Sequence, residues 1–496
     1  MFILVLLITT VSAFDLIREA FKYVDNTVDP CENFYRHACP ITGVDGFMIV
    51  HEYADVLFKL KVKESDAPWN NLEIVEALKR TRFREFYSPT QFIADLFQKQ
   101  CEDANVSRHD LENYVNQITY YLYGKKDLSA LALDHNCTRA TGTLKYELSS
   151  YGLGDTGSFI YRAVGRIRRA QIGLQGANAI LNGDDRDGVT IVQGFVEEMK
   201  AKLTSWINQT SWAVNNDAVD PIITETLQLN IYDNYAESLR ENLDYLFRLE
   251  LDYLKCVRDT KNDEDHQVFC MIMAVGSAGS SPDIHFFTYF NANNDHPTLH
   301  FSHLLYDMAK NVKELAGVLG SVGYIVGHEV SHSLIEDPNV PELLPYSSND
   351  SIQCIQNQYQ KTCDTFKEGP CGVLDNQIDE NGADMLGMQL AYSLFEDAYG
   401  GRMRDEYIRI AVSPDSYQSI TMEQLFFYST AFVSCKGVAQ GQELGDDHSP
   451  AHIRANAMAQ HPGFRQAFNC ASDSKMVQSF TDQCIIYGEG APESRR

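Results

Sequence analysis

The sequence predicts a mainly α-helical protein with two lobes. It has 496 residues, of which 44% are hydrophobic, so it can form more than one hydrophobic core and exceeds the usual size of one domain. Apolar residues recur at helical spacing in 227–245 and in 246–254, a pattern typical of amphipathic helices. Strand-like alternation is scarce outside 284–290. We therefore expect a small sheet within a largely helical protein.

A His-Glu-x-x-His pattern lies in the segment 326–335, VGHEVSHSLI. Its two histidines, His328 and His332, are about one helical turn apart, so a helix places both imidazoles on one face, where they can bind zinc. Glu329 lies beside them, where a carboxylate can take a proton from a water whose pKa the cation lowers. Apolar residues recur every fourth position from Val322 and favour a buried helix. The alternative is an ordinary core helix that carries the pattern by chance.

A second acidic helix offers a third metal ligand, which catalytic zinc sites typically require. Glu380 and Asp384 lie four residues apart at the start of a predicted helix that begins near Asp379. One carboxylate can bind the metal while the other accepts the free N–H of a zinc-bound imidazole. The alternative is an acidic helix N-terminus, capped by Asp379 and favoured by the helix dipole.

Together the two helices resemble those of the neprilysin and endothelin-converting enzyme family of zinc metallopeptidases, in which a GHE-x-x-H helix precedes a G-E-N-x-A-D helix. Asp379 stands here in place of the Gly. The resemblance implies one Zn²⁺ per chain and a two-lobed, gluzincin-type fold, with a small β-sheet beside the HExxH helix and a covering helical lobe. It implies these roles: His328, His332 and Glu380 as metal ligands, Glu329 as general base, and Asp384 as the carboxylate behind a histidine ligand.

The resemblance continues through the C-terminal half. The segment 424–435 is similar to the family's Q-L-F-F…W-C segment, and 446–454 matches its D-x-H-S-P…R motif. By this match His448 donates a hydrogen bond to the developing oxyanion, and Arg454 donates to a substrate carbonyl. Upstream, Asn291 and Ala292 correspond to the N-A-F-Y strand that holds the peptide as an added strand. The Asn-Asn pair that follows Ala292 is otherwise an ordinary turn.

Two departures from the family pattern bear on activity. The family continues G-F-D after the second histidine, but Ser-Leu-Ile stands at 333–335, so the Asp that orients this ligand is absent from its usual place. Ser434 replaces the Trp before Cys435, which removes an apolar wall from the pocket for the side chain after the scissile bond. Because Ile325 still lines this pocket in the family's arrangement, we expect a preference for hydrophobic residues with an altered pocket shape.

The N-terminus and the cysteines predict a secreted protein. The apolar residues 1–11 are followed by small residues, as in a removable signal peptide, and no run reaches the roughly 20 apolar residues that span a bilayer. We therefore expect no stable membrane anchor. Twelve cysteines without a C-x-x-C pattern favour disulfides. N-glycosylation sequons begin at Asn105, Asn136, Asn208 and Asn349.

The family resemblance also implies disulfide pairings, because residues 29–39 are similar to its P-C-x-D-F-Y-x-Y-A-C opening. The implied pairs are Cys31–Cys470, Cys39–Cys435 and Cys354–Cys484, with Cys101–Cys256 as a further pairing. The partners of Cys137, Cys270, Cys363 and Cys371 stay open, although Cys363 and Cys371 are close enough in sequence to bridge a local loop.

These observations predict the domain organisation. The predicted segments are a signal peptide at 1–13, an N-terminal segment at 14–45 that is disulfide-linked to the catalytic lobe, a covering lobe at 46–279, a catalytic zinc metallopeptidase domain at 280–488 and a tail at 489–496. The covering lobe is shorter than in the family, which either opens the cleft or reflects loss of helices remote from it. A net charge of −27 argues against nucleic acid and anionic membranes as partners.

The resemblance implies a secreted zinc endopeptidase that hydrolyses peptides or small proteins through a zinc-bound water, on the amino side of hydrophobic residues. The alternative is a catalytically inactive neprilysin-like protein that binds peptides or a protein partner. Retention of all the residues named above for the metal, the base and the oxyanion argues against inactivity. A structural glycoprotein with an accidental motif is opposed by the agreement of four separate segments.

Overall fold

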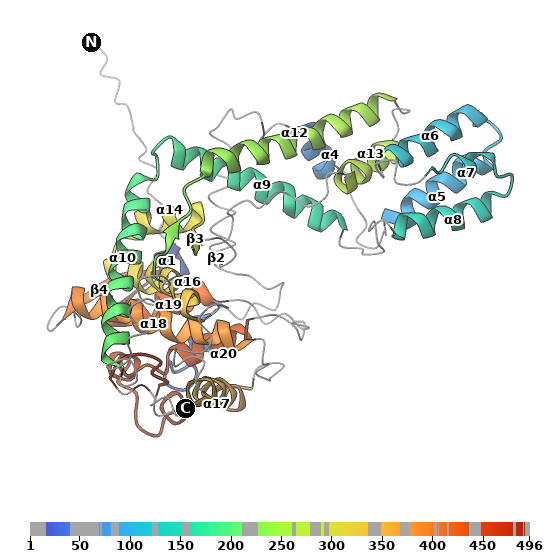
Figure 1. Ribbon diagram of the computed structural model, residues 1–496. Coiled ribbons are helices and arrows are strands. Elements are labelled where there is room, and N and C mark those ends of the chain that lie inside the picture. The colour runs from blue at the N-terminus through green and yellow to red at the C-terminus, as the bar shows by residue number, and fades with distance from the viewer. Residues whose placement is uncertain are drawn as a thin grey trace, which may run out of the picture. The chain divides into compact units, whose positions relative to one another are not determined.

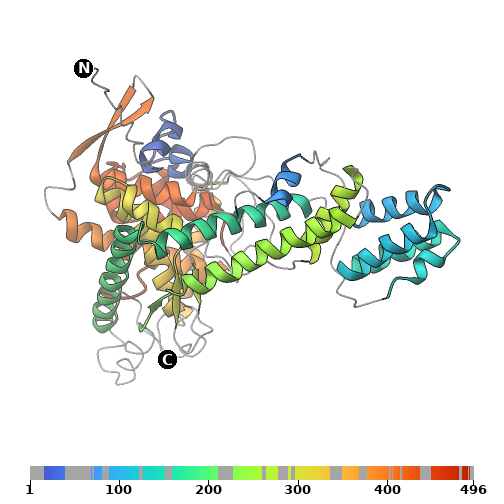
Figure 2. The same cartoon turned by 90° about the horizontal axis from the view of Figure 1, so that it is seen from above.

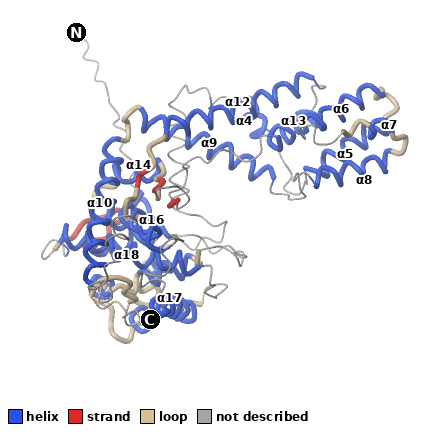
Figure 3. The backbone as a smooth tube through the Cα atoms, viewed as in Figure 1, coloured by secondary structure: helices blue, strands red, loops and turns tan. Residues whose placement is uncertain are grey.

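The structure is a computed structural model that describes residues 16–39, 69, 72–80, 89–121, 127–150, 159–210, 227–259, 264–277, 289–291, 297–335, 349–367, 377–400, 404, 406–413, 416–435, 448–479, 483–489 and 491. Helices dominate these residues (Figure 3), as the sequence predicts. The chain divides into two compact units. Unit 1 comprises Met1–Leu57, Gly183–Asp233 and Phe287–Arg496, and unit 2 comprises Phe58–Asn182 and Asn234–Phe286. Residues 183–233 thus pack with unit 1, whereas the predicted segment limits stay a prediction.

Unit 1 contains the HExxH segment and the elements around it (Figure 1). Its helices are α1 (Leu16–Ala20), η1 (Phe21–Tyr23), α2 (Phe34–Ala38), α10 (Arg186–Gln209), α14 (His303–Asn311), α15 (Leu315–Val318), the π-helical η3 (Leu319–Gly323), α16 (Tyr324–Ile335), α17 (Asn349–Thr365), α18 (Ile378–Tyr399), α19 (Met422–Ser434), α20 (Ala451–Met458), α21 (Pro462–Ala467) and α22 (Lys475–Ser479). Its strands are β1 (Asn230–Ile231), β2 (Tyr289–Asn291), β3 (Thr298–His300), β4 (Tyr407–Ser413) and β5 (Ser416–Thr421).

The centre of unit 1 is a close crossing of α16 and α18. Both helices carry fully buried apolar side chains, such as Val330 and Leu386, as expected of helices enclosed by other helices. They approach through two glycines. A Cβ atom on Gly387 would lie 2.5 Å from the His328 backbone nitrogen, and one on Gly327 would lie 2.8 Å from the Gly387 carbonyl oxygen. The two backbones therefore touch at the HExxH segment.

The π-helical turn η3 leads directly into α16. Its Gly320 lies against α19, where an added Cβ atom would collide with the Phe426 carbonyl oxygen. Thr430 of α19 donates a hydrogen bond to the Gly320 carbonyl at 2.8 Å. Insertions of π-helix are often found at functional sites, and this one ends five residues before His328.

Two small sheets accompany these helices. In the first, with strand order β1-β3-β2, β1 pairs in parallel with β3, and β2 pairs antiparallel with β3 through Phe290 opposite Leu299. Strand β2 packs against α16, so the small sheet expected beside the HExxH helix is present. The second sheet is the β4–β5 hairpin, seen in orange at the edge of unit 1 in Figure 2.

The N-terminal segment is fastened to the C-terminal part of unit 1. Disulfides join Cys31 to Cys470 and Cys39 to Cys435, and the Met476 amide donates to the Cys31 carbonyl at 3.0 Å. A third disulfide joins Cys354 to Cys484. These three predicted pairings are confirmed, and such long closures strongly restrict the unfolded chain.

The described secondary-structure elements of unit 2 are all helices. Its helices are α4 (Glu73–Arg80), α5 (Pro89–Glu102), α6 (Arg108–Tyr121), α7 (Ala130–Leu133), α8 (Cys137–Ser150), α9 (Phe159–Leu181), α12 (Tyr235–Asp259) and α13 (Glu264–Ser277). The two longest, α9 and α12, lie side by side (Figures 1 and 2). The core includes a ring contact of Tyr114 with Phe269 at 4.5 Å. The helix expected over 227–245 begins only at Tyr235, because Asn230 and Ile231 pair with β3.

The predicted Cys101–Cys256 disulfide is wrong. Cys101 pairs with Cys137 across the packed helices α5 and α8, with Cα atoms 5.7 Å apart, and Cys256 pairs with Cys270 across α12 and α13 at 5.5 Å. Each bond thus forms between neighbouring helices of one unit. Cys363 is disulfide-bonded, but its expected partner Cys371 lies outside the described residues.

Several predictions concern residues outside the described part of the chain. These are the signal peptide at 1–13, Ala292, and most of the 489–496 tail. Asn105, Asn136 and Asn208 are exposed, as glycosylation requires, but glycosylation itself stays a prediction. Within the described residues, every helix is too short or too polar to cross a membrane.

Candidate metal centre

The crossing of α16 and α18 brings together the three predicted metal ligands. Nε2 of His328 lies 3.1 Å from Nε2 of His332 and 3.1 Å from Oε2 of Glu380. Nε2 of His332 lies 3.6 Å from the same carboxylate oxygen. Tetrahedral ligands at roughly 2.0–2.1 Å from zinc would be about 3.3–3.4 Å from one another. The three separations bracket this value, so the residues fit a zinc ion.

The surroundings of Glu380 support the same fit. Among the described residues, its buried Oε2 atom accepts no hydrogen bond of good geometry, although three imidazole Nε2 atoms lie within 3.6 Å of it. Burial alone would raise the pKa of Glu380, but the facing rings of His328, His332 and His448 lower it far below its usual value. The carboxylate therefore stays charged, as a metal ligand must.

His448 is a further group at this centre. Its Nε2 atom lies 3.0 Å from Oε2 of Glu380, and its side chain is 42% exposed. Potential ligand atoms of His328, Glu380 and His448 all lie within 4.8 Å of one another. The backbone near His448 is held at the start of α18, because Gln377 donates to the His448 carbonyl and accepts from the Ser449 hydroxyl, both at 3.2 Å.

Glu329 lies beside the first histidine on α16, with 7% of its surface exposed. Burial raises the pKa of its carboxyl group, and this effect outweighs the nearby imidazoles of His328 and His332, which act in the opposite direction. The group can therefore hold a proton more readily than an ordinary surface glutamate.

Behind the three ligands lies Asp384, which is fully buried and surrounded by donors. Its carboxylate accepts hydrogen bonds from the hydroxyl groups of Tyr324 at 2.6 Å and Tyr359 at 3.2 Å. Arg454 donates to both of its oxygens, from Nε at 2.7 Å and from Nη2 at 2.6 Å. Nδ1 of His328 lies 3.0 Å from Oδ1. Four hydrogen bonds thus fix the carboxylate, and Nδ1 of His328 faces it.

The electrostatics of this cluster are mutually supporting. Burial alone would raise the pKa of Asp384, but the charge and hydrogen bonds of Arg454 lower it well below its usual value. Burial alone would lower the pKa of His328, but the carboxylates of Asp384 and Glu380 raise it. Asp384 is therefore ionised and can hold the Nδ1 side of the ring, leaving Nε2 for a metal.

The sequence analysis missed Tyr324 and Tyr359. Tyr324 precedes His328 by one helical turn, so the same spacing argument that paired the histidines could have found it. Tyr359 gave no such signal, because α17 reaches Asp384 only through tertiary packing against α18 and α20. Arg454 was expected to bind substrate, and the structure shows two of its N–H groups directed at Asp384.

The remaining predicted residues lie around the centre. The Asn291 backbone pairs with Thr298 in the β2–β3 ladder, whereas its side chain lies outside the described atoms. Ile325 is partly buried on α16. Two serines that depart from the family pattern form hydrogen bonds within their own helices. Ser333 donates to the Val330 carbonyl at 2.7 Å, and Ser434 donates to the Thr430 carbonyl at 3.0 Å.

Comparisons with known proteins agree with this geometry. The sequence model of Peptidase family M13 matches residues 289–484. Neprilysin-1 of Caenorhabditis elegans is 27% identical over 186 residues, which cover 34% of this chain and 23% of the relative. Neprilysin-1 of Trittame loki is 26% identical over 189 residues, which cover 34% and 25%. The chain thus matches only a minor part of the length of either relative.

The fold is also similar to a solved structure, the Haemonchus galactose containing glycoprotein complex. The TM-score is 0.50 at 15% identity, over 92% of this chain and 96% of the other, which is a likeness of fold alone. The family match covers the part of unit 1 that contains α16 and α18, which cross at two glycines and carry the three candidate metal ligands. Through residues 289–484, this chain belongs to peptidase family M13, the neprilysin family.

Proposed function

We propose that the chain is a secreted zinc-dependent endopeptidase that cleaves peptides or small proteins on the amino side of hydrophobic residues. The observation that carries the proposal is the convergence of His328, His332 and Glu380 at the separations of a tetrahedral zinc site. Family membership supports both the metal and the peptide substrates. Five disulfides among the described cysteines support an oxidising, extracellular location.

His328, His332 and Glu380 would hold the zinc ion. Bound zinc supplies a Lewis acid that lowers the pKa of water and polarises the peptide carbonyl. Glu329 then acts as the general base that removes a proton from the attacking water. Its buried position and raised pKa suit a carboxylate that keeps this proton until the leaving amine accepts it.

Asp384 is the positioning residue behind His328. Its carboxylate lies 3.0 Å from Nδ1 of the ring, where accepting the Nδ1–H would fix the tautomer and direct Nε2 at the metal. Tyr324, Tyr359 and Arg454 hold the carboxylate in place. A guanidinium has five N–H donors, so Arg454 keeps donors for a substrate carbonyl while two of them bind Asp384.

His448 is the proposed oxyanion donor. It is accessible, with 42% of its side chain exposed, and its motif is tied to α18 through Gln377. A donor that bonds the oxygen only after negative charge develops stabilises the transition state more than the substrate.

The first sheet supports an extended peptide as substrate. In the strand order β1-β3-β2, strand β2 lies at the edge of the described strands and packs against α16. An extended peptide can add to such an edge through main-chain hydrogen bonds, which tolerate many sequences. Asn291 lies at the end of this strand, and Ile325 of α16 is proposed to line the pocket for the hydrophobic side chain.

The proposal is tested by measuring zinc content and turnover of a fluorescence-quenched peptide, with and without a chelator. We expect about one zinc per chain and turnover that the chelator abolishes. Glu329→Gln should keep the zinc and lose the turnover, because the amide preserves size but cannot act as a base. Glu380→Ala should release the zinc. Full zinc content with no turnover of any peptide would instead favour an inactive peptide-binding protein, and zinc retained in Glu380→Ala would place the third ligand elsewhere.

A further inference from the structure

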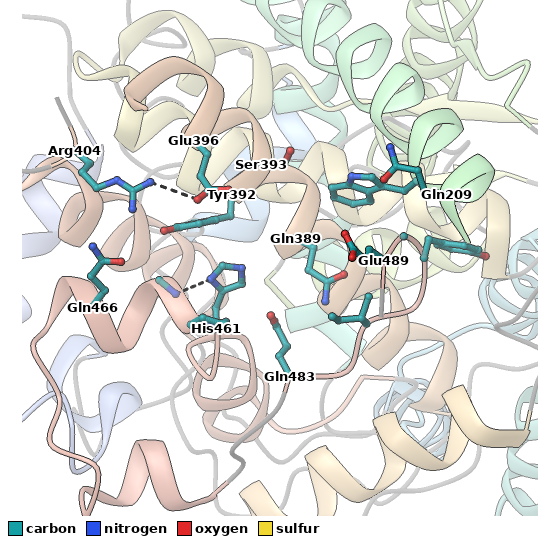
Figure 4. A pocket seen from close by; sticks show the side chains of 16 residues that line it. Gln209, Gln389, Tyr392, Ser393, Glu396, Arg404, His461, Gln466, Gln483 and Glu489 are labelled. Atoms are coloured by element: carbon teal, nitrogen blue, oxygen red, sulfur yellow. Dashed lines mark hydrogen bonds and ion pairs between the residues drawn. The ribbon is translucent and has the colours of Figure 1, made fainter. Parts of the chain in front are cut away.

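A cavity of about 680 Å³ lies in unit 1 (Figure 4), and its described lining includes none of the residues of the metal centre. Helices α10, α18 and α21 and the C-terminal segment 483–489 line it. On α18 its lining begins at Gln389, nine residues beyond Glu380, or about 13 Å along the helix. Its size falls within the range of about 300–1,000 Å³ typical of small-ligand sites.

The charges around the cavity disfavour anionic ligands. Among the described lining residues, the basic side chains are Arg404 and one histidine. Arg404 is already paired with Glu396 at 3.4 Å and with the buried Glu423 at 3.7 Å. Burial lowers the pKa of the histidine, His461, to about 3, so this ring brings no positive charge at neutral pH. Phosphate and carboxylate groups would therefore find no free cation among the described lining residues.

Besides the carboxylates of Glu396 and Glu489, the described walls offer neutral amide and hydroxyl groups that both donate and accept hydrogen bonds. Four glutamines line the cavity, and the Gln389 amide donates to the Cys484 carbonyl at 2.7 Å, beside Gln483. Within the described part of the chain, Nε2 of Gln483 and the hydroxyl of Tyr487 are buried without a hydrogen-bond partner. Tyr487 is only 2% exposed. Buried polar groups are normally satisfied, so two side chains of the lining each carry an unused hydrogen-bonding group.

Aromatic side chains complete the lining, with Trp206 on α10 and Tyr392 on α18. The described lining residues belong to helices and irregular segments, so they offer no strand edge to which an extended peptide could add. A saccharide ring combines hydroxyl groups, which donate and accept like the amides, with an apolar C–H face that packs on aromatic rings. We propose that this cavity binds a neutral saccharide, either free or as part of a glycan on a protein.

The test is saturation-transfer NMR of the zinc-loaded full chain with lactose, maltotriose and chitotriose as probes. At least one of them should receive saturation at up to about 10 mM, a concentration that nearly fills a site of 1 mM affinity. The same sugar linked to a carrier protein should compete with the free sugar if the natural source is a glycoprotein glycan. Failure of the carrier-linked sugar to compete assigns the cavity to free saccharides.

Two variants connect the binding to this cavity. Gln483→Glu removes the unpartnered donor at constant size, and it should weaken binding about tenfold or more. Trp206→Ala removes the aromatic surface and should weaken binding similarly. Gln353→Glu makes the same chemical change on the exposed face of α17 and should leave binding unaltered. Zinc content and peptide turnover should stay at wild-type levels in all three variants.

Three results would overturn the proposal. The first is an absence of saturation for all three sugars with a folded, zinc-loaded chain. The second is wild-type affinity in both Gln483→Glu and Trp206→Ala. The third is preferential binding of sialyllactose over lactose, because a carboxylate-bearing sugar should find no free cation in the cavity.

Discussion

The crossing of α16 and α18 makes Gly387→Ala the most informative structural variant. The added Cβ atom would lie 2.5 Å from the His328 nitrogen, 2.8 Å from the His328 Cα and 2.9 Å from the Gly327 carbonyl carbon. All three are backbone atoms of α16, so no flexible side chain can move aside. The helices themselves must separate at the residue that carries the first metal ligand.

The size of the separation follows from these distances. Ordinary contact begins at 3.4 Å, so a contact at 2.5 Å must open by about 0.9 Å. The 3.1 Å gap between His328 and Glu380 would then approach 4 Å, beyond the roughly 3.3–3.4 Å that one tetrahedral zinc ion bridges. We expect zinc affinity to fall by about 10- to 100-fold or more, and overpacking to cost roughly 1–3 kcal/mol of stability.

Zinc affinity can be measured by competition with a fluorescent chelator, and stability by urea unfolding. The matched control is Gly194→Ala in α10, where an added Cβ atom meets nothing within 4 Å. That variant should keep its zinc and gain roughly 0.5–1 kcal/mol, because alanine favours the helix. Wild-type zinc affinity and stability in Gly387→Ala would refute the view that this glycine contact sets the geometry of the metal centre.

Three further variants test the cluster and the pH dependence. Tyr324→Phe removes one hydrogen bond from Asp384 and should weaken zinc binding about tenfold by chelator competition; unchanged affinity would show that the other donors suffice. His448→Ala should lower kcat about 100-fold with little change in KM, whereas a change in KM alone would indicate substrate anchoring. Burial lowers the pKa of His461 to about 3, so the unfolded chain takes up a proton at this ring more readily than the folded one below about pH 6.5. The free energy of unfolding should therefore fall by at most about 2 kcal/mol when the pH is lowered to 5. His461→Asn keeps an acceptor for the Gly463 amide, and its free energy of unfolding, measured with urea, should fall by that much less between pH 7 and pH 5 than in the wild type. The exposed control His109→Asn should lose as much stability as the wild type. A loss in His461→Asn equal to that of the wild type would refute the assignment.

The sequence could supply the parts of the centre that depend on local spacing. His328 and His332, one turn apart, and Glu380 and Asp384, one turn apart, require only helical periodicity to share a face. The resemblance to the M13 family then related the two helices and implied the three long disulfides that the structure confirms. These features are carried by short motifs, so a single chain contains enough information to locate them.

The failures came where pairing depends on which helices become neighbours. Cys101 was assigned to Cys256, but the packing of α5 on α8 gives it Cys137 instead. Residues 227–234 were expected to be helical, but Asn230 and Ile231 form a short strand that pairs with β3. Local pattern cannot fix such choices, since they are decided by contacts between residues distant in sequence.

The sequence by itself determined the chemistry of the candidate ligands, the periodicity that places each pair on one helical face, and the cysteines of the N-terminal attachment. Only the tertiary structure decided that Tyr359 and Arg454 would converge on Asp384, and that a cavity would form among α10, α18 and α21. The physical reason is the range of the interactions. Helical periodicity is a property of neighbouring residues, whereas the contact of Gly327 with Gly387 exists only once two helices have packed backbone to backbone.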